Sequence, residues 1–425
     1  MPGGPDHPGV PGIPLRPSRA PVRRLWAAVA LGYLSLGVGL QLLPHDLAQR
    51  GGTPEPLVPV LVGLPFLASA WVRPRAGRLA DRGLARGAVA AGAVAVAVGA
   101  AGQAATVNPG SVAIARLLVG LGEGLLFSGA LPWVLAAAPA ARRGRVAGWF
   151  GLSMWTGLTV GPAAAVLTAG LGAAGTTLAW VLAVAAPLTA LGLVASAGRQ
   201  AEVRSRDASP APSDPPTGRR RRRWGRRSSA ERLPGIYLGL VACGYGVVIS
   251  MLALYLRSRG LPDTAGLTVL AAAFLVVRAA GSPAVDRWGP ARPAAVLAVV
   301  QGVALAVLPT VTGVPGALVV CAAVGAGVAL AYPCAVALTL GTPSARPPGV
   351  AIGVTTSCWD LGLFAAGLGA GALSLAAGQA APFFAGAMAS AGAAAVLLPA
   401  AVTAMRGRGA DGDARTPRRQ RGGRG

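Results

Sequence analysis

The sequence is poor in charge, since only 12% of its 425 residues are Asp, Glu, Lys or Arg while 53% are hydrophobic. A soluble domain has about 25% charged residues. The low charge excludes an ordinary soluble domain and predicts a membrane protein. Charge-free runs such as residues 88–106 are long enough to cross a hydrocarbon core about 30 Å thick, which takes roughly 20 helical residues.

Residues that bind metals or form disulfides are also scarce. The chain has two histidines and four cysteines, and the cysteines lie in apolar segments at Cys243, Cys321, Cys334 and Cys358. We therefore expect neither a disulfide framework nor a metal site. The sequence also has no glycine-rich loop for a nucleotide phosphate, so we expect no cofactor and a chain that is not an enzyme.

The apolar runs predict twelve membrane-crossing helices in two halves. The first six lie near residues 25–43, 57–72, 88–106, 112–136, 146–169 and 174–196. The second six lie near residues 235–256, 265–281, 293–312, 316–340, 349–376 and 381–404. We expect one bundle over residues 25–197 and another over 234–404. Proline and arginine enrichment predicts a cytoplasmic linker at 198–233 and disordered cytoplasmic tails at 1–24 and 405–425.

Lysine is absent, and the 38 arginines are distributed unevenly between the predicted loops. The loops after the second, fourth, eighth and tenth spans hold twelve arginines, and the loops on the opposite side hold three. Basic loops stay in the cytoplasm, so both termini are predicted to be cytoplasmic. The arginine run at residues 219–223 is expected to contact anionic lipid headgroups, at about 1 kcal/mol per residue. This distribution explains the net charge of +24 without nucleic acid as a partner.

An arginine-rich pattern occurs twice in the chain. Residues 73–87 read RPRAGRLADRGLARG, and at an offset of 205 Arg73 meets Arg278, Asp81 meets Asp286 and Arg82 meets Arg287. A repeat at this spacing predicts a duplicated architecture. Asp81 and Arg82 are suited to latch neighbouring helix ends, because a carboxylate is stabilised at a helix N-terminus and an arginine by carboxylates and lipid phosphates.

Two six-helix halves with this repeated loop resemble the major facilitator superfamily of secondary transporters. Gly77-Arg-Leu-Ala-Asp81-Arg82 follows the superfamily's loop motif, although Leu84 stands where a glycine is usual. The resemblance implies an all-α membrane protein with twelve transmembrane helices, in two six-helix bundles related by pseudo-twofold symmetry. It also implies a gating role for the loop and its copy, carried by Gly77, Asp81, Arg82, Asp286 and Arg287.

The fourth span contains two ionisable residues, Arg116 and Glu123. Seven residues turn a helix by 700°, so both side chains point within about 20° of one face, roughly 10 Å apart along the axis. A charge facing lipid at a helix centre costs at least about 2.5 kcal/mol, so we expect both to face the interior. Arg116 matches a superfamily motif that implies proton coupling, and Glu123 is the first candidate for a proton carrier. The alternative for Glu123 is a static bond to Arg116 or to another helix.

The fifth span carries Gly157, Gly161 and Pro162 in a spacing similar to the antiporter motif of proton-coupled exporters. Glycines one turn apart let two helices approach closely, and the proline bends the span. The motif usually closes with two glycines, whereas this chain has Ala165 and Val166 there. An importer or uniporter of a sugar or amino acid therefore stays open as an alternative.

Asp360, about twelve residues into the eleventh span, is a further candidate for proton or cationic-substrate handling, with a helix-packing hydrogen bond as the alternative. In the superfamily the first, fourth, seventh and tenth spans line the cavity. This implies four substrate-cavity candidates, which could equally serve packing: Tyr33, Gln41, Tyr245 and Tyr332.

The stretch SCWDLG at residues 357–362, with Tyr245-Gly246 and Tyr332-Pro333, resembles the bacterial arabinose-efflux-like and opine-metallophore-exporter (drug efflux) branch. The branch implies proton-coupled export of a small organic molecule or drug by alternating access. We expect a monomer in the bacterial inner membrane, with the substrate, protons and the lipid bilayer as its partners. A membrane anchor whose linker binds an acidic partner is the alternative from another class, and deletion of residues 201–227 would distinguish the two because a transporter should keep working.

Overall fold

The computed structural model describes residues 19–50, 57–136, 138, 143–207, 232–261, 263–342 and 346–413, which form helices joined by short connections. The helices of the first half are α1 (Arg19–Arg50), α2 (Leu57–Asp81), α3 (Ala85–Ala105), α4 (Pro109–Ala136), α5 (Arg143–Ala169) and α6 (Gly172–Asp207). Those of the second half are α7 (Leu233–Ser258), α8 (Asp263–Ala280), α9 (Ser282–Trp288), α10 (Ala291–Val307), the 3-10 helix η3 (Leu308–Thr310), α11 (Val314–Val328), α12 (Ala331–Gly341), α13 (Pro348–Ala377) and α14 (Ala381–Asp413).

Every predicted apolar run coincides with a helix or a helix pair. Within the described residues, ten segments are long and apolar enough to cross a membrane, and α8 contains a shorter apolar stretch at Ala265–Ala280. Large apolar side chains project outward, including Leu167, Leu375 and Met388, which are 81%, 92% and 74% exposed. Such exposure is favourable only against lipid. The prediction of an all-helical membrane protein is confirmed.

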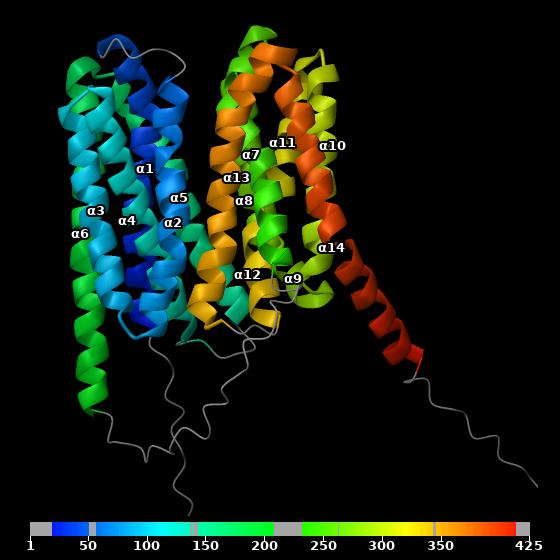
Figure 1. Cartoon of the computed structure of the whole chain (residues 1–425), viewed down its shortest axis with the longest axis horizontal. Helices are drawn as coiled ribbons and strands as arrows, with labels where there is room; N and C mark the ends of the chain where they lie inside the picture. Colours follow the sequence, from blue (N-terminus) through cyan, green and yellow to red (C-terminus); the bar gives the residue numbers. More distant parts are fainter. Residues whose placement is uncertain are drawn as a thin grey trace, which may run out of the picture.

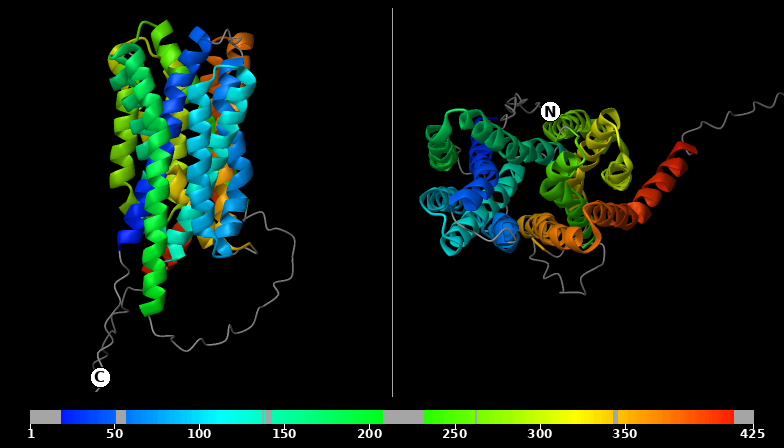
Figure 2. Two further views of the ribbon diagram at one scale, coloured as in Figure 1. Left: turned by 90° about the vertical axis from the view of Figure 1, so that its left-hand side faces the viewer. Right: turned by 90° about the horizontal axis from the view of Figure 1, so that it is seen from above.

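The helices form two bundles that stand side by side (Figures 1 and 2). The N-terminal bundle contains α1–α6 and the C-terminal bundle contains α7–α14. Helix α13 of the C-terminal bundle packs along both α7 of its own bundle and α2 of the other. The largest cluster of buried hydrophobic residues also spans both bundles, since it includes Phe127 and Phe150 from one and Tyr332 and Leu363 from the other.

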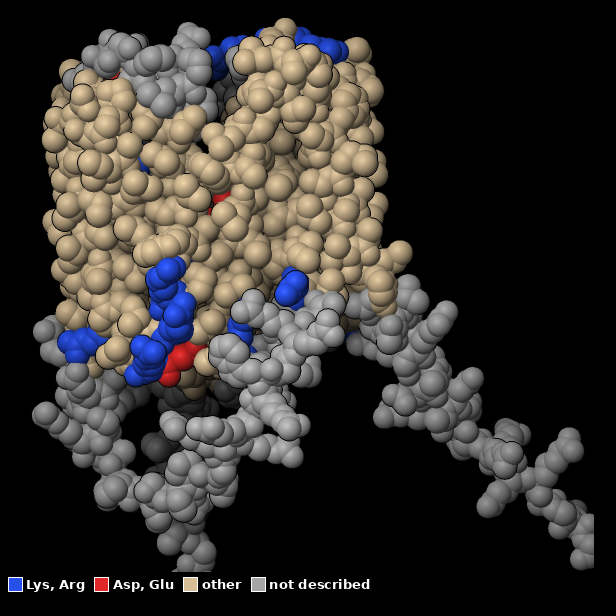
Figure 3. Space-filling view, in the orientation of Figure 1, with Lys and Arg blue, Asp and Glu red and all other residues tan. Residues whose placement is uncertain are grey.

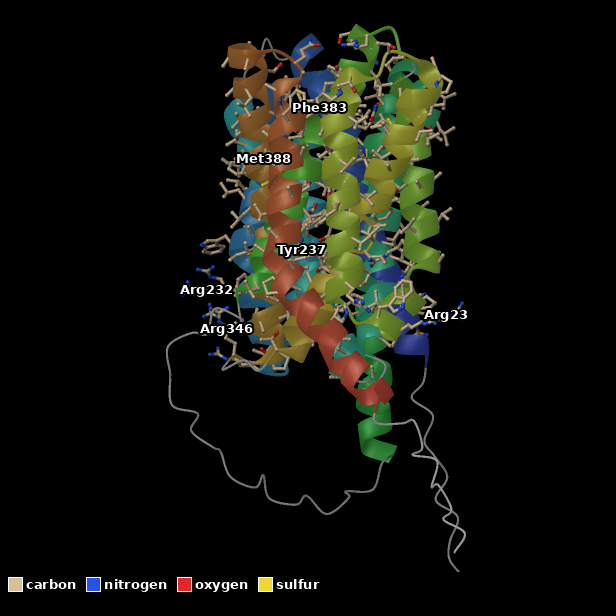
Figure 4. All side chains as sticks on the ribbon, turned by 90° about the vertical axis from the view of Figure 1, so that its right-hand side faces the viewer. Arg23, Arg232, Tyr237, Arg346, Phe383 and Met388 are labelled. Carbon is tan, nitrogen blue, oxygen red and sulfur yellow. The ribbon has the colours of Figure 1, made fainter. Side chains whose placement is uncertain are left out.

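Basic side chains gather at one end of the molecule, which we name the arginine end. Arg23, Arg232 and Arg346 lie at this end in Figure 4. Figure 3 shows a different face of the molecule, on which more basic side chains are visible at this end than at the opposite end. Helix α2 ends here at Asp81, and α13 begins here at Pro348. The predicted linker and both predicted tails attach at this end, although most of their residues lie outside the described part of the chain.

Several helices extend beyond their predicted limits. Helix α1 begins at Arg19, α6 continues to Asp207 and α14 continues to Asp413, so the predicted tail and linker boundaries at residues 24, 198 and 405 fall inside helices. Pro21 is compatible with this start, because a first-turn proline lacks only an N–H that has no helical acceptor. No proline occurs at residues 198–209 or 405–416 to end the other two helices.

The twelve arginines counted for the loops of one side included Arg73 and Arg278, and this assignment is wrong, because the two residues lie within α2 and α8 and are only 2% and 3% exposed. Burial of a guanidinium inside a membrane protein requires acceptors for its N–H groups. Both side chains have acceptors on the opposite bundle, as the contacts below show.

The predicted tenth span is divided between α11 and α12. Pro333 has no N–H to donate to the carbonyl of Ala329, four residues earlier, so the regular hydrogen-bond ladder stops there. Prolines at positions 65 and 74 act in the same way inside α2.

Candidate functional site

A buried ion pair joins the two bundles. Arg73 of α2 donates through Nε to Oδ2 of Asp360 on α13, and its Nη2 lies 3.2 Å from Oδ1 of the same carboxylate. Both residues are 2% exposed. A two-pronged bond between guanidinium and carboxylate is the strong form of this interaction, so the pair holds α2 against α13.

Aromatic and hydroxyl groups surround Arg73. Its Nη2 lies 3.4 Å from the hydroxyl of Tyr33 on α1, and its Nη1 lies 3.5 Å from Oγ of Ser128 on α4. The guanidinium carbon lies 5.9 Å from the centre of the Phe127 ring. These contacts place Tyr33, a predicted substrate-cavity residue, beside Asp360, a predicted proton-handling residue.

Glu123 of α4 belongs to the same central cluster. It is 1% exposed, and its Oε1 has no hydrogen-bond partner among the described residues. Asp360, Arg73 and Arg116 are its electrostatic neighbours. A buried carboxylate oxygen without a partner is costly when charged. Glu123 is therefore the group in this cluster best suited to carry a proton.

Arg116 does not pair with Glu123. Its Nε lies 3.3 Å from the carbonyl oxygen of Leu61, its Nη2 donates to the carbonyl of Val62, and its Nη1 lies 3.4 Å from Oε1 of Gln103. The Leu61 carbonyl lacks a helical donor because Pro65 stands four residues later. Arg116 thus satisfies the carbonyl that Pro65 frees on α2, and its predicted role in proton coupling stays a prediction.

The same arrangement occurs at two other prolines. Pro74 frees the carbonyl of Ala70, and Oγ of Ser357 on α13 donates to it at 2.7 Å. Pro333 frees the carbonyl of Ala329, and Nη1 of Arg278 donates to it at 3.1 Å. At each of these prolines, a side chain from another helix satisfies the free carbonyl.

Arg278 is the repeat partner of Arg73 and also reaches across to the other bundle. Its Nη2 lies 2.9 Å from the carbonyl oxygen of Gly148 on α5. Gly148 at the offset of 205 corresponds to Gly353 on α13, and Gly353 packs on the backbone of Arg73. The two arginines therefore lie against equivalent glycines of the opposite bundle, Arg278 through its guanidinium and Arg73 through its backbone.

Asp81 joins the two bundles at the arginine end. Its Oδ1 and Oδ2 accept hydrogen bonds from the backbone N–H groups of Gly349 and Val350, at 2.9 and 3.0 Å. These N–H groups lie in the first turn of α13, where the helix dipole attracts a carboxylate. Gly77 packs directly on Gly349, where a Cβ atom would overlap the backbone.

The two bonds from α13 to Asp81 involve none of the other predicted gating residues. Arg82 is exposed beside Asp81, and Arg287 is exposed on α9. The side chain of Asp286 lies outside the described part of the structure. Gly157 and Gly161 of α5 pack on the backbone of α1, and Cδ of Pro162 meets Gly37 of α1, so these three residues join helices of one bundle.

The substrate-cavity candidates divide into three places. Tyr33 and Tyr332 both pack against Phe127, with ring centres 6.4 and 5.5 Å away. Tyr245 lies in a neighbouring aromatic cluster of both bundles, 5.7 Å from Trp155 and 5.9 Å from Trp359 between ring centres. Gln41 lies elsewhere, on a cavity of about 1100 Å³ between helices of the N-terminal bundle.

Sequence reasoning missed Arg73 as a site residue. A useful signal was present, because an acidic residue at mid-span, such as Asp360, calls for a buried cationic partner. The repeat had already paired Arg73 with Arg278, and a duplicated arginine next to an apolar run is a reasonable candidate for that partner. Ser357 gave no such signal, because its acceptor exists only through the bend at Pro74.

Comparison with known proteins identifies what this architecture is similar to. The model of the Major Facilitator Superfamily matches residues 25–367. An uncharacterized MFS-type transporter of Salmonella typhimurium is 29% identical over 353 residues, which cover 80% of this chain and 85% of the relative. An uncharacterized MFS-type transporter of Burkholderia mallei is 28% identical over 378 residues, which cover 84% and 86%.

Solved structures share the fold at low sequence identity. The human organic anion transporter MFSD10 (TETRAN) is 19% identical with a TM-score of 0.67, covering 90% of this chain and 100% of that chain. The transporter FucP in its outward conformation is 17% identical with a TM-score of 0.61, covering 90% and 99%.

Proposed function

Because the chain belongs to the major facilitator superfamily and is a secondary transporter rather than an enzyme, we propose that it exports a small organic molecule in exchange for protons. The two bundles, over residues 25–197 and 234–404, are the units that rock about the central cluster. We place it in the arabinose-efflux-like and opine-metallophore-exporter branch, as a monomer in the bacterial inner membrane with its arginine end in the cytoplasm.

The central cluster supports the proton-coupled part of this proposal. Glu123 is buried with one unbonded carboxylate oxygen, and it lies near the ion pair that joins the bundles. A carboxylate that faces water from one side and then the other carries a proton between those sides. The position of Glu123 beside an inter-bundle bond is the single observation on which the proposal depends.

The contacts at the arginine end support a state closed on that side. Asp81 bonds α13, Arg278 bonds Gly148 and Arg73 bonds Asp360, and each contact joins the two bundles. A structure closed at a cytoplasmic arginine end is outward-facing, as is the FucP structure with which it shares a fold.

Purified protein in lipid vesicles tests the proposal. A ligand panel screened by thermal shift first identifies a transported compound. An imposed proton gradient should then drive accumulation of that compound against its own gradient, and Glu123→Gln should abolish this accumulation while downhill exchange remains. Ser390→Ala is the matched control, because Ser390 is a buried hydroxyl bonded within its own helix. A proton gradient that drives no accumulation of any ligand found in the panel refutes the coupling.

Direction needs a separate measurement, because an importer or uniporter is the second candidate. Ala165 and Val166 stand where the exporter motif has glycines, and the fold is also that of a fucose:proton symporter. Cells that overproduce the protein should retain less of a labelled substrate than control cells. Greater retention would reverse the proposed direction.

A further inference from the structure

We infer that Arg73 couples the proton to the rocking of the bundles by exchanging its partner, Asp360 in the closed state for Glu123 when the arginine end opens. The inference rests on the proposed function and names the residue that transmits its coupling. It begins from three observations: an ion pair between bundles, an adjacent buried acid, and the placement of that acid in the same bundle as Arg73.

Helices α2 and α4 bring Arg73 and Glu123 together. Gly120 of α4 packs on the backbone of Pro65, and Gly124 packs on Ser69 and Val72 of α2. A Cβ atom at either glycine would overlap α2, so the two helices are as close as backbones allow. Glu123 follows one of these contacts by three residues and precedes the other by one, so it stays near Arg73 whatever the other bundle does.

Asp360 belongs to the other bundle. Arg73 is eight residues from the end of α2 at Asp81, about 12 Å at the helical rise, so it lies between the centre and the arginine end. Opening that end moves α13 away from α2. The move breaks the bond from Arg73 to Asp360. Tyr33 and Ser128 of its own bundle then offer only neutral hydroxyl groups, so Glu123 is the acid left to pair with Arg73.

Arg73 cannot remain unpaired in the bundle interior, because a guanidinium keeps its charge and needs acceptors. In the closed state Asp360 supplies two carboxylate oxygens, and Glu123 keeps its proton because Oε1 has no donor. In the open state the Glu123 carboxylate supplies the acceptors after it loses that proton. Asp360 then faces the water at the arginine end.

The step balances as one proton released per opening. Before opening, Glu123 is a neutral carboxyl group and the Arg73 cation is paired with the Asp360 anion. After opening, the Arg73 cation is paired with the Glu123 anion, the Asp360 anion is hydrated, and one proton has entered the water at the arginine end. Return to the closed state restores the bond to Asp360, and Glu123 takes a new proton from the opposite side. No other reactant is required.

Other charged or titratable groups face the exchange without replacing either acid. They are Tyr33 from α1, Arg116 from α4, Tyr332 from α12 and Cys358 from α13 itself. Besides Glu123 and Asp360, the buried acid among the described residues is Asp46, which accepts a hydrogen bond from Trp180 of α6. Arg116 is held by the carbonyls of α2 and is not available as a substitute for Arg73.

Distance measurement between the bundles tests the exchange without any substrate. Spin labels at Leu84 and Gly341, both exposed at the arginine end, report the ratio of open to closed molecules in a background without native cysteines. In the parent protein the ratio should rise with pH, by up to tenfold per unit, because one proton leaves per opening.

The two acid substitutions should act in opposite directions. Glu123→Gln removes the second partner and should hold the arginine end closed at every pH. Asp360→Asn removes the first partner and should open it, with at least a tenfold higher ratio of open to closed molecules. The control is Arg75→Gln, which removes an exposed arginine two residues from Arg73 that stacks on Trp71 of its own helix, and it should match the parent.

A merely structural ion pair gives another result. Loss of packing would move both acid variants the same way, and that outcome overturns the inference, as does a pH dependence that survives Glu123→Gln. The charge-swapped variant R73D/D360R keeps a pair between bundles but offers no exchange, so it should remain closed and insensitive to pH even if a single variant fails to fold. If proton-driven transport is observed but Glu123→Gln and Asp360→Asn shift the ratio of open to closed molecules in the same direction, only the exchange is refuted. If the two variants shift this ratio in opposite directions but a proton gradient drives no transport, only the proposed function is refuted.

Discussion

Replacing Gly77 by alanine should open the arginine end without unfolding the protein. The new Cβ atom would overlap the carbonyl carbon and oxygen of Gly349 and lie 2.9 Å from the backbone nitrogen of Val350. These are backbone atoms of α13, so no rotation of a side chain relieves the overlap. Only separation of α2 from α13 does, and this separation is the opening itself.

The size of the shift follows from the cost of overpacking. An extra carbon in a filled site costs about 1–3 kcal/mol, and a cost of about 2 kcal/mol in the closed state alone changes the ratio of states by about 30-fold. Two other glycines separate this effect from general damage. A Cβ atom at Gly87 meets nothing within 4 Å, while one at Gly120 would overlap Pro65 within the same bundle.

The assay combines the label distance between Leu84 and Gly341 with thermal unfolding of each variant. Gly77→Ala should lengthen the distance between the labels and leave the unfolding temperature nearly unchanged. Gly120→Ala should lower the unfolding temperature, because its overlap lies within one bundle and is present whether the arginine end is open or closed. Gly87→Ala should change neither the distance nor the unfolding temperature. The reasoning fails if Gly77→Ala keeps the closed distance of the parent, or if it loses as much thermal stability as Gly120→Ala.

Three further variants test separate contacts. Arg116→Gln should lower the free energy of unfolding by about 3 kcal/mol, because three hydrogen bonds are lost at about 1 kcal/mol each. The pH profile of transport should keep its shape, and a shifted profile would show that Arg116 takes part in proton coupling. Arg278→Gln should raise the open fraction about fivefold, because the bond to Gly148 exists only when the bundles meet, and an unchanged label distance would contradict this. A cysteine at Leu84 should resist a membrane-impermeant maleimide added to intact cells while one at Gly260 reacts, and the reverse pattern would invert the proposed topology.

Hydropathy predicted the helices well because membrane crossing leaves little choice of structure. A run of about 20 apolar residues in lipid must satisfy its own backbone, so each predicted run became a helix. Their ends were predicted less well, as α2 shows. The run seemed to stop at Arg73 because a charge normally marks the interface, but a charge with a partner in the interior does not mark it.

The sequence indicated some of the buried polar residues for a related reason. Glu123 and Asp360 were named as candidates because an acid inside an apolar run has few structural explanations, and both are buried in the structure; their roles stay predictions. Their relationship through Arg73 depends on which helices touch, and a single sequence gives only the position of each residue along its own helix. The alternative in which Glu123 pairs with Arg116 used helix periodicity alone, and it could not include the carbonyl that Pro65 leaves free on α2.

The carbonyl that Pro74 frees on α2 should also help to separate the proposed closed state from the open one. Ser357 donates to the carbonyl that Pro74 frees, and this bond crosses between the bundles. In the opening proposed above, α13 moves away from α2 and the carbonyl of Ala70 loses its bond to Ser357. Water entering at the arginine end would then replace Ser357, because a partial opening without water leaves an unpaired buried carbonyl and is disfavoured. Arg73 follows Ala70 by three residues on the same helix. The Ala70 carbonyl and the Arg73 guanidinium would therefore both lose their partners on α13 in the same movement. Because both losses occur together, the proposed opening has two separate states and no stable intermediate between them.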